Sequence, residues 1–215
     1  MSNVIATDRV PAKVHISVMS GKLKGISAIN TNTVTNEFCH KMYNQQDENI
    51  ICTHCYSQDM LTGSRKNCQP SFQRNSDLLS SRALLSDEIP ILNERWFRYD
   101  GHGELINVQH LFNLVLIAEK NPWCNFGLWT KRKDLVSEYR KHVGPIPKNI
   151  ILIFSNPRLD RMMHKPPAGF DKVFNNVPKD YDGDANCTGQ KCIDCRLCYE
   201  HNDTSVIVEH VKKRS

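Results

Sequence analysis

Apolar residues recur along the chain in two patterns that alternate. Short runs with the composition of strands occupy 95–99, 126–130 and 150–154, and apolar residues at helical spacing follow at 108–120 and 135–143. Strands that alternate with helices in this way are typical of parallel sheets joined by right-handed crossovers. The pattern therefore predicts an α/β fold in which helices follow strands.

The flanking parts of the chain extend this pattern. Residues 13–30 alternate in polarity around a Lys-Gly turn and predict one or two short strands, and residues 172–174 and 205–208 predict the last strands. Residues 71–86 have helical spacing and stop before a proline. Because a complete eight-stranded barrel takes about 250 residues, we expect a compact or partial (β/α) barrel, TIM-barrel-like, of about six strands.

The length and composition of the chain indicate a single globular domain with one hydrophobic core. A chain of 215 residues with 40% hydrophobic content is long enough to bury one sizeable core, so we expect a single domain over residues 1–215. Residues 1–12 do not have the pattern of a signal peptide, in which an apolar run follows a basic segment. No apolar run approaches the roughly 20 residues that span a bilayer. We therefore expect a cytoplasmic protein with no membrane partner, whose thiols stay reduced.

Four of the nine cysteines fall within residues 187–198, and we call this set the C-terminal centre. Its members are Cys187, Cys192, Cys195 and Cys198. Successive x2 spacings resemble the run that holds a cubane iron–sulfur cluster, whereas a zinc site more often takes two C-x2-C pairs from separate turns. The spacing favours a closed [4Fe–4S] centre packed at one end of the barrel, with zinc as the alternative.

A second set, the N-terminal centre, consists of Cys39, Cys52 and Cys55. Cys52 and Cys55 form a C-x2-C pair, and Cys39 lies thirteen residues before Cys52 on a segment that reads as a polar loop. Three thiolates would leave one iron of a cubane open to a substrate or cofactor. The sequence leaves open whether there are one or two clusters, since Cys39 could join the C-terminal set. Cys68 and Cys124 read as small structural residues.

Polar residues follow several of the predicted strands. Residues 100–104, Asp-Gly-His-Gly-Glu, come directly after the strand at 95–99, Thr130 and Lys131 end the strand at 126–130, and Ser155 ends the next one. In α/β folds the carboxyl ends of parallel strands form the binding edge. We expect these residues to converge there with the Cys52–Cys55 segment, which also follows a predicted strand.

Five motifs occur in one order along the chain. They are Cys52-x2-Cys55-Tyr56, Phe97-Arg98-x4-Gly103-Glu104-Leu105, Trp129-Thr130-Lys131, Gly144-Pro-x-Pro147-x-Asn149 and Cys192-x2-Cys195-Arg-x-Cys198. Together they resemble the phage "gene product 88" family, which is itself similar to radical S-adenosylmethionine proteins. The resemblance covers about residues 19–208. It implies a viral origin, action in the host cytoplasm, a barrel-like α/β fold and a cubane cluster at the N-terminal centre.

The first functional hypothesis is a redox enzyme that binds and cleaves S-adenosylmethionine at the N-terminal centre. The catalytic candidates are Asp100, His102, Glu104 and Lys131. The cofactor-binding candidates are Arg98, Gly103, Glu104, Thr130 and Ser155. Carboxylates would hold the cofactor's ammonium and ribose, Arg98 and Lys131 would hold anionic groups, and His102 would move a proton near neutral pH.

The second hypothesis is a non-catalytic protein stapled by iron–sulfur or zinc, which binds a host protein or nucleic acid. Nucleic acid is the weaker of these partners, because the net charge of +5 is modest and three of the cations, Lys212, Lys213 and Arg214, lie in the tail. A small-molecule or macromolecular substrate is expected for the first hypothesis, but its identity does not follow from these residues.

Overall fold

The structure is a computed structural model that describes residues 12–211. Residues 1–11 and the basic tail with Lys212, Lys213 and Arg214 lie outside the described residues.

The described residues build one seven-stranded sheet whose strands stand in chain order. The strands are β1 (Ile16–Val18), β2 (Ser27–Ile29), β3 (Trp96–Tyr99), β4 (Asn125–Thr130), β5 (Ile150–Ser155), β6 (Lys172–Val177) and β7 (Val206–His210). β1 pairs with β2 antiparallel, and every later pair is parallel. The α/β prediction with a parallel sheet is confirmed. The sheet is open, with β1 and β7 at its edges.

Three longer helices lie between the strands: α3 (Gln69–Ser81), α4 (Val108–Lys120) and α5 (Lys133–His142). α4 begins where predicted because Asn107 caps it, accepting a hydrogen bond from His110 N at 2.9 Å. The prediction that α3 runs to residue 86 is wrong. Arg82 is extended, and Leu84 N instead donates to Asn113 Oδ1 of α4 at 2.9 Å.

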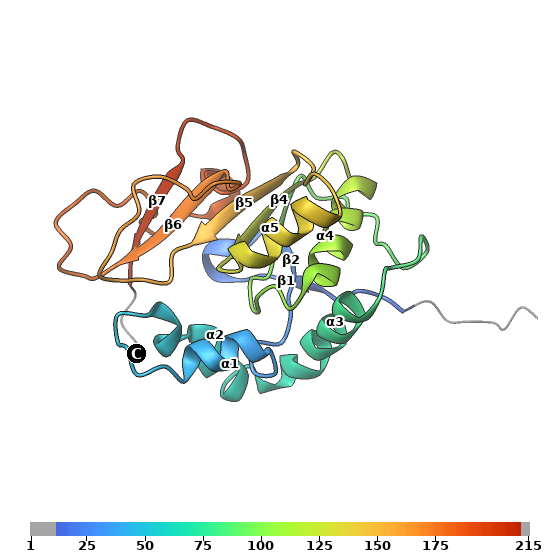
Figure 1. The fold of residues 1–215 in the computed structure, drawn as a ribbon, viewed down its shortest axis with the longest axis horizontal. Coiled ribbons are helices and arrows are strands. Elements are labelled where there is room, and N and C mark those ends of the chain that lie inside the picture. The colour runs from blue at the N-terminus through green and yellow to red at the C-terminus, as the bar shows by residue number, and fades with distance from the viewer. Residues whose placement is uncertain (1–11, 212–215) are drawn as a thin grey trace, which may run out of the picture.

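The main core lies between the sheet and these helices. Figure 1 shows α4 and α5 on one side of the strands. Alternate residues of the strands point to this side, among them Phe97, Tyr99 and Phe126, and they pack with leucines of α4. The rings of Tyr99 and Phe126 stack with centroids 4.7 Å apart. This packing fixes the strands whose carboxyl ends carry the predicted site residues.

The opposite face of the sheet has a smaller apolar cluster and a different cover. Ile151, Ile153, Phe174 and Ile207 form this cluster, and Trp129, Cys187 and Cys198 pack against it. The cysteine-rich segment therefore covers the face that the helices leave uncovered. Gly127 permits the close approach, since a Cβ there would lie 3.0 Å from the Cys198 carbonyl oxygen and 2.6 Å from the Trp129 ring.

Shorter helices carry several cysteines. They are η1 (Gly21–Leu23), α1 (Glu37–Tyr43), η2 (Ile51–His54), α2 (Tyr56–Thr62), η3 (Lys66–Cys68) and α6 (Cys192–Cys195). Two predictions are wrong here: Cys39 lies on a helix rather than a loop, and Cys52 follows an isolated bridge between Ile50 and Arg158 rather than a strand. In Figure 1, α1 and α2 lie together below the sheet.

Within residues 12–211, no helix combines the length and the apolar character needed to cross a membrane.

Candidate metal centres

The four cysteines of the C-terminal centre line one small cavity of about 20 Å³, together with Tyr199 and Ile207. Cys192 and Cys195 are the first and last residues of α6, and Arg196, at φ 56°, turns the chain sharply after them. The turn brings Cys198 back toward the cavity. All nine cysteines of the chain are free thiols in the structure.

Burial makes these thiols hard to ionise without a compensating cation. It raises the pKa of Cys198 to about 12, with a smaller contribution from the other three cysteines, while the neighbouring Arg98 lowers it. The pKa values of Cys187 and Cys192 are also raised, mainly by burial. Since thiolates are the form that binds metal, a bound metal would have to supply the positive charge that keeps them ionised.

Donors from three parts of the chain surround the sulfur atoms of this centre. Lys22 Nζ lies 3.7 Å from Cys187 Sγ, and Gln190 Nε2 lies 3.4 Å from Cys195 Sγ. The Arg98 guanidinium lies close enough to lower the pKa values of Cys192 and Cys198. Neither Lys22 nor Gln190 was predicted. Lys22 is 165 residues from Cys187 in the chain, and Gln190 lies within the cysteine-rich segment but is not a residue type that binds iron or zinc.

The N-terminal centre takes its thiols from three elements that meet near Lys131. Cys39 lies on α1, Cys52 lies on η2, and Cys55 is the N-cap residue of α2. Burial, Glu104 and the other two cysteines raise the pKa of Cys39, while Lys131 lowers it. Burial lowers the pKa of Lys131, but Cys52, Glu104, Cys55 and Cys39 outweigh it, so the pKa is raised overall. Lys131 is therefore a cation shared by all three thiols.

Glu104 links this centre to the sheet. Its buried carboxylate accepts hydrogen bonds from the Thr130 hydroxyl, from Lys131 N at 2.9 Å and from Leu105 N at 2.8 Å. Its carbonyl oxygen accepts from Asn36 Nδ2 at 3.0 Å, and Asn36 Oδ1 accepts from Cys39 N at 3.1 Å. The carboxylate thus organises the ends of β3 and β4 around the first cysteine.

The loop that carries Glu104 is tightly packed against residues 30–33. Gly103 has φ 103°, and a Cβ at this position would overlap the Thr31 hydroxyl. Asp100, at φ 49°, accepts a hydrogen bond from Thr31 Oγ1 at 2.7 Å. Burial raises the pKa of Asp100 to about 8. Its Oδ2 has no hydrogen-bond partner among the described residues and lies 4.0 Å from Nε2 of His110, on α4.

His102 is buried within the same loop. Its Nδ1 lies 2.8 Å from the Ser57 hydroxyl of α2, and its ring packs between Tyr56 and Phe72. Burial, assisted by Arg65 and Arg98, lowers the pKa of His102 to about 4. The imidazole is therefore neutral at pH 7, which gives no support to a proton transfer near neutral pH.

Two other candidates lie on the sheet face that the cysteine-rich segment covers. Arg98 stacks on the Trp129 ring with its guanidinium carbon 3.8 Å from the ring centroid. Its Nε and the nearby Tyr199 hydroxyl have no hydrogen-bond partner of good geometry among the described residues. Ser155 is buried at the last position of β5.

The structure thus divides seven of the eight predicted site residues outside the cysteines into three groups, and Ser155, the last residue of β5, belongs to none of them. The first group belongs to the N-terminal centre: Lys131 interacts electrostatically with its thiols, and Thr130 donates a hydrogen bond to Glu104. Arg98 lies beside the C-terminal centre, where it lowers the pKa of Cys198. Asp100, His102 and Gly103 are packed in the supporting loop. The predicted convergence of all these residues at one edge therefore holds only for part of the set.

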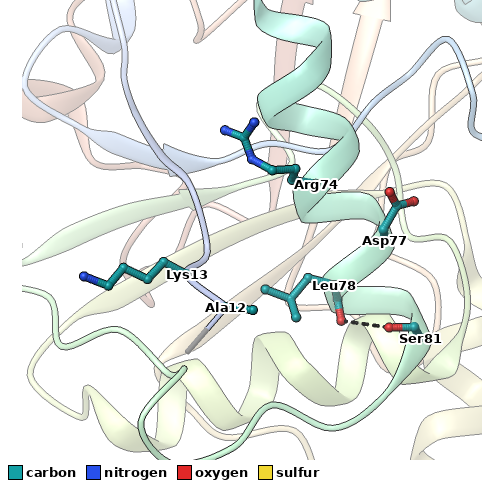
Figure 2. Close-up of a pocket in the computed structure, with 6 residues that line it drawn as sticks. All are labelled: Ala12, Lys13, Arg74, Asp77, Leu78 and Ser81. Carbon is teal, nitrogen blue, oxygen red and sulfur yellow. Dashed lines mark hydrogen bonds between the residues drawn. The ribbon is translucent and has the colours of Figure 1, made fainter. Parts of the chain in front are cut away.

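Across residues 12–211, no group of three or more His, Cys, Asp and Glu side chains is arranged to hold a metal ion. A cavity of about 460 Å³ lies elsewhere, between α3 and the segment before β1. Figure 2 shows its lining residues, which are Ala12, Lys13, Arg74, Asp77, Leu78 and Ser81. The lining includes no cysteine and no predicted site residue.

Comparison of the chain with protein-family models, with curated proteins and with solved structures finds no match.

Proposed function

We propose that the protein is a phage-type iron–sulfur protein with two [4Fe–4S] centres, and that the open N-terminal centre forms the active site of a redox enzyme. One observation carries the proposal: seven of the nine cysteines form two sets, of which four line one cavity and three interact electrostatically with Lys131. Metal binding accounts for this grouping in a chain whose cysteines form no disulfide.

The residues of the C-terminal centre fit a metal cluster by their chemistry. A centre with four thiolates carries net negative charge, and Lys22 and Arg98 place positive charge beside it. Gln190 adds a neutral donor to Cys195. Hydrogen bonds to cluster sulfurs are a general feature of iron–sulfur sites. The x2 spacings favour a cubane cluster over zinc, and zinc is the alternative metal for these four cysteines.

The N-terminal centre fits an open cluster by its donor number and its position. All three thiols interact electrostatically with Lys131, which directly follows the last residue of β4. When bound there, a [4Fe–4S] cluster supplies single electrons and one coordination position for a cofactor such as S-adenosylmethionine. Lys131 would bind an anionic group of that cofactor, and Glu104 would hold the Lys131 backbone in place through its 2.9 Å hydrogen bond.

The arrangement of the sheet supports the resemblance to radical S-adenosylmethionine proteins. The six strands from β2 to β7 are parallel and stand in chain order, as the strands of a (β/α) barrel do. Lys22, which precedes β2, forms an ion pair at 2.5 Å with Glu209 of β7, so side chains bridge the two edges of the open sheet. We therefore interpret the fold as a partial barrel.

The experiment that tests the two centres is iron and sulfide content on protein purified without oxygen. Wild type should hold about eight irons per chain, and Cys52→Ala and Cys195→Ala about four each. Cys68→Ala is the matched control, because Cys68 belongs to neither set, and it should keep the wild-type content. Zinc without sulfide would overturn the iron–sulfur assignment.

The enzymatic part needs a separate assay. Wild type mixed with S-adenosylmethionine and dithionite under argon should release methionine and 5′-deoxyadenosine, and Cys52→Ala should release neither. Cys68→Ala should behave as wild type. Intact clusters with no cleavage would refute the redox enzyme and leave a metal-stapled protein that binds a host protein.

A further inference from the structure

Lys22 belongs to the C-terminal centre in space although it lies near the start of the chain. It is the middle residue of η1, between β1 and β2. Its Nζ lies 3.7 Å from Cys187 Sγ and 2.5 Å from Glu209 Oε1. The ammonium is thus shared between a thiol of the centre and a carboxylate of the last strand.

The main chain around Lys22 is also docked on the cysteine-rich segment. η1 contacts α6. A Cβ on Gly25 would lie 3.7 Å from Cγ1 of Ile193, a residue that lies between Cys192 and Cys195 in the sequence. Gly25 has φ 93°, a conformation that glycine adopts without strain. The turn therefore approaches the centre as a unit, and the Lys22 contact does not depend on one flexible side chain alone.

The position of the ammonium has an electrostatic consequence for a cluster in this centre. The side chains of Lys22 and Glu209 are only 24% and 14% exposed, so solvent screens the charges incompletely. A reduced cluster carries one more negative charge than the oxidised form, and a neighbouring cation stabilises the more negative form more strongly. Glu209 holds the ammonium in this position.

We propose that Lys22 is a positioning residue of the C-terminal centre: by donating a hydrogen bond to the Cys187 thiolate, it raises the reduction potential of the cluster there and slows the loss of that cluster. The inference rests on the proposed function, because it concerns a cluster held by these four cysteines. It adds to that function a residue near the opposite edge of the sheet, Lys22, that sets the reduction potential and the retention of the cluster.

The test uses the full chain with Cys52→Ala, so that only the C-terminal centre is loaded. In that background, Lys22→Met should shift the midpoint potential to a more negative value and weaken cluster retention against a chelator by about tenfold, as for other partners of metal ligands. Lys22→Arg keeps the charge and should restore most of both properties. Lys22→Gln keeps a neutral donor and should give an intermediate potential.

Lys24→Met is the matched control, because it removes the same charge from an exposed position two residues away. It should leave both the potential and the retention unchanged. Equal potentials and retention for Lys22→Met and Lys24→Met, or a wild-type potential with wild-type retention in Lys22→Met, would overturn the inference while the cluster itself stands. Absence of iron and sulfide from the Cys52→Ala parent would instead overturn the proposed function.

Discussion

The two cysteine centres differ in what holds their ligands. In the C-terminal centre all four cysteines come from residues 187–198, and the regular structure in this range is the single four-residue helix α6. In the N-terminal centre the three cysteines come from α1, η2 and α2, and the buried Asn36 and Glu104 tie α1 to the sheet. Under the proposed function, metal would organise the first centre, whereas hydrogen bonds within the protein organise the second.

The backbone hydrogen bonds support this contrast. The cysteine-rich segment is anchored at its start, where Cys187 N donates to Val208 O at 3.0 Å and Asn186 bonds the same strand. The loop beside the N-terminal centre instead bonds buried partners, including Thr31 N to His102 O at 3.0 Å and Asp100 N to Ile29 O at 2.9 Å. Buried bonds of this kind persist without a ligand.

Metal removal should produce the largest difference between the two regions. In amide hydrogen exchange on chelated protein, residues 187–198 should lose nearly all their protection, because metal binding supplies the folding free energy of such a segment. The amides of α1 should keep most of theirs. The comparison breaks if α1 and the cysteine-rich segment lose protection to the same degree.

Glu104→Ala should be the most damaging single change at the N-terminal centre. It leaves the buried Thr130 hydroxyl and the Lys131 N–H without their acceptor, which costs about 2–4 kcal/mol in the free energy of unfolding. Iron at the N-terminal centre, measured in a Cys195→Ala background, should fall as well. Urea unfolding of Glu138→Ala, an exposed carboxylate of α5, provides the control and should show little change.

Asp100→Asn should remove a pH dependence that belongs to the supporting loop. The pKa of Asp100 is about 8 in the fold and 3.8 ordinarily, so between these values the folded state keeps a proton that the unfolded chain has lost. The free energy of unfolding therefore falls as pH rises through this window. His110, whose pKa is lowered to about 3, acts in the opposite sense below its ordinary 6.5.

The cleanest measurement of this effect lies between pH 6.5 and 8. There wild type should lose about 2 kcal/mol that Asp100→Asn does not lose. Asp134→Asn is the control, since Arg132 lowers the pKa of that carboxyl and places its titration outside the window. Identical pH profiles for wild type and Asp100→Asn would show that Asp100 is ionised throughout.

Asn36→Ala should give the smallest effect and the sharpest comparison. It removes the N-cap of α1 and the bond to the Glu104 carbonyl, at a cost of about 1 kcal/mol. Asn107→Ala removes the equivalent cap of α4 and should cost about the same. Only Asn36→Ala should weaken iron retention at the N-terminal centre. Equal retention in both variants would mean that capping does not position Cys39.

The periodic parts of the chain were predictable because burial on a sheet or a helix face leaves a regular pattern. The strands at 126–130 and 150–154 and the helix at 108–120 appear close to their predicted bounds. α1 and α2 were missed because α1 has no buried residue and α2 has only Ser57 and Leu61, so neither helix leaves an apolar repeat in the sequence. α1 also depends on its N-cap Asn36, which lies in a polar stretch of the sequence.

The candidate site was predictable only where ligands are close in sequence. The spacing of Cys192, Cys195 and Cys198 predicted the C-terminal centre, and in the structure Cys187 lines the same cavity as these three residues. The contacts of Lys22 cross 165 and 187 residues, and local pattern carries no information at that separation. Burial of His102, which decides its protonation, likewise depends on Tyr56 and Phe72 from other elements.

The bridge between Lys22 and Glu209 also bears on how the chain is made. Translation proceeds at about 5–20 residues per second, so Lys22 leaves the ribosome roughly ten to forty seconds before Cys187 and Glu209 follow it. In a nascent chain, Lys22 therefore lacks its contacts with Cys187 and Glu209 for most of the synthesis. A product truncated before residue 187 lacks both partners, so the contact forms only on a chain translated nearly to its end.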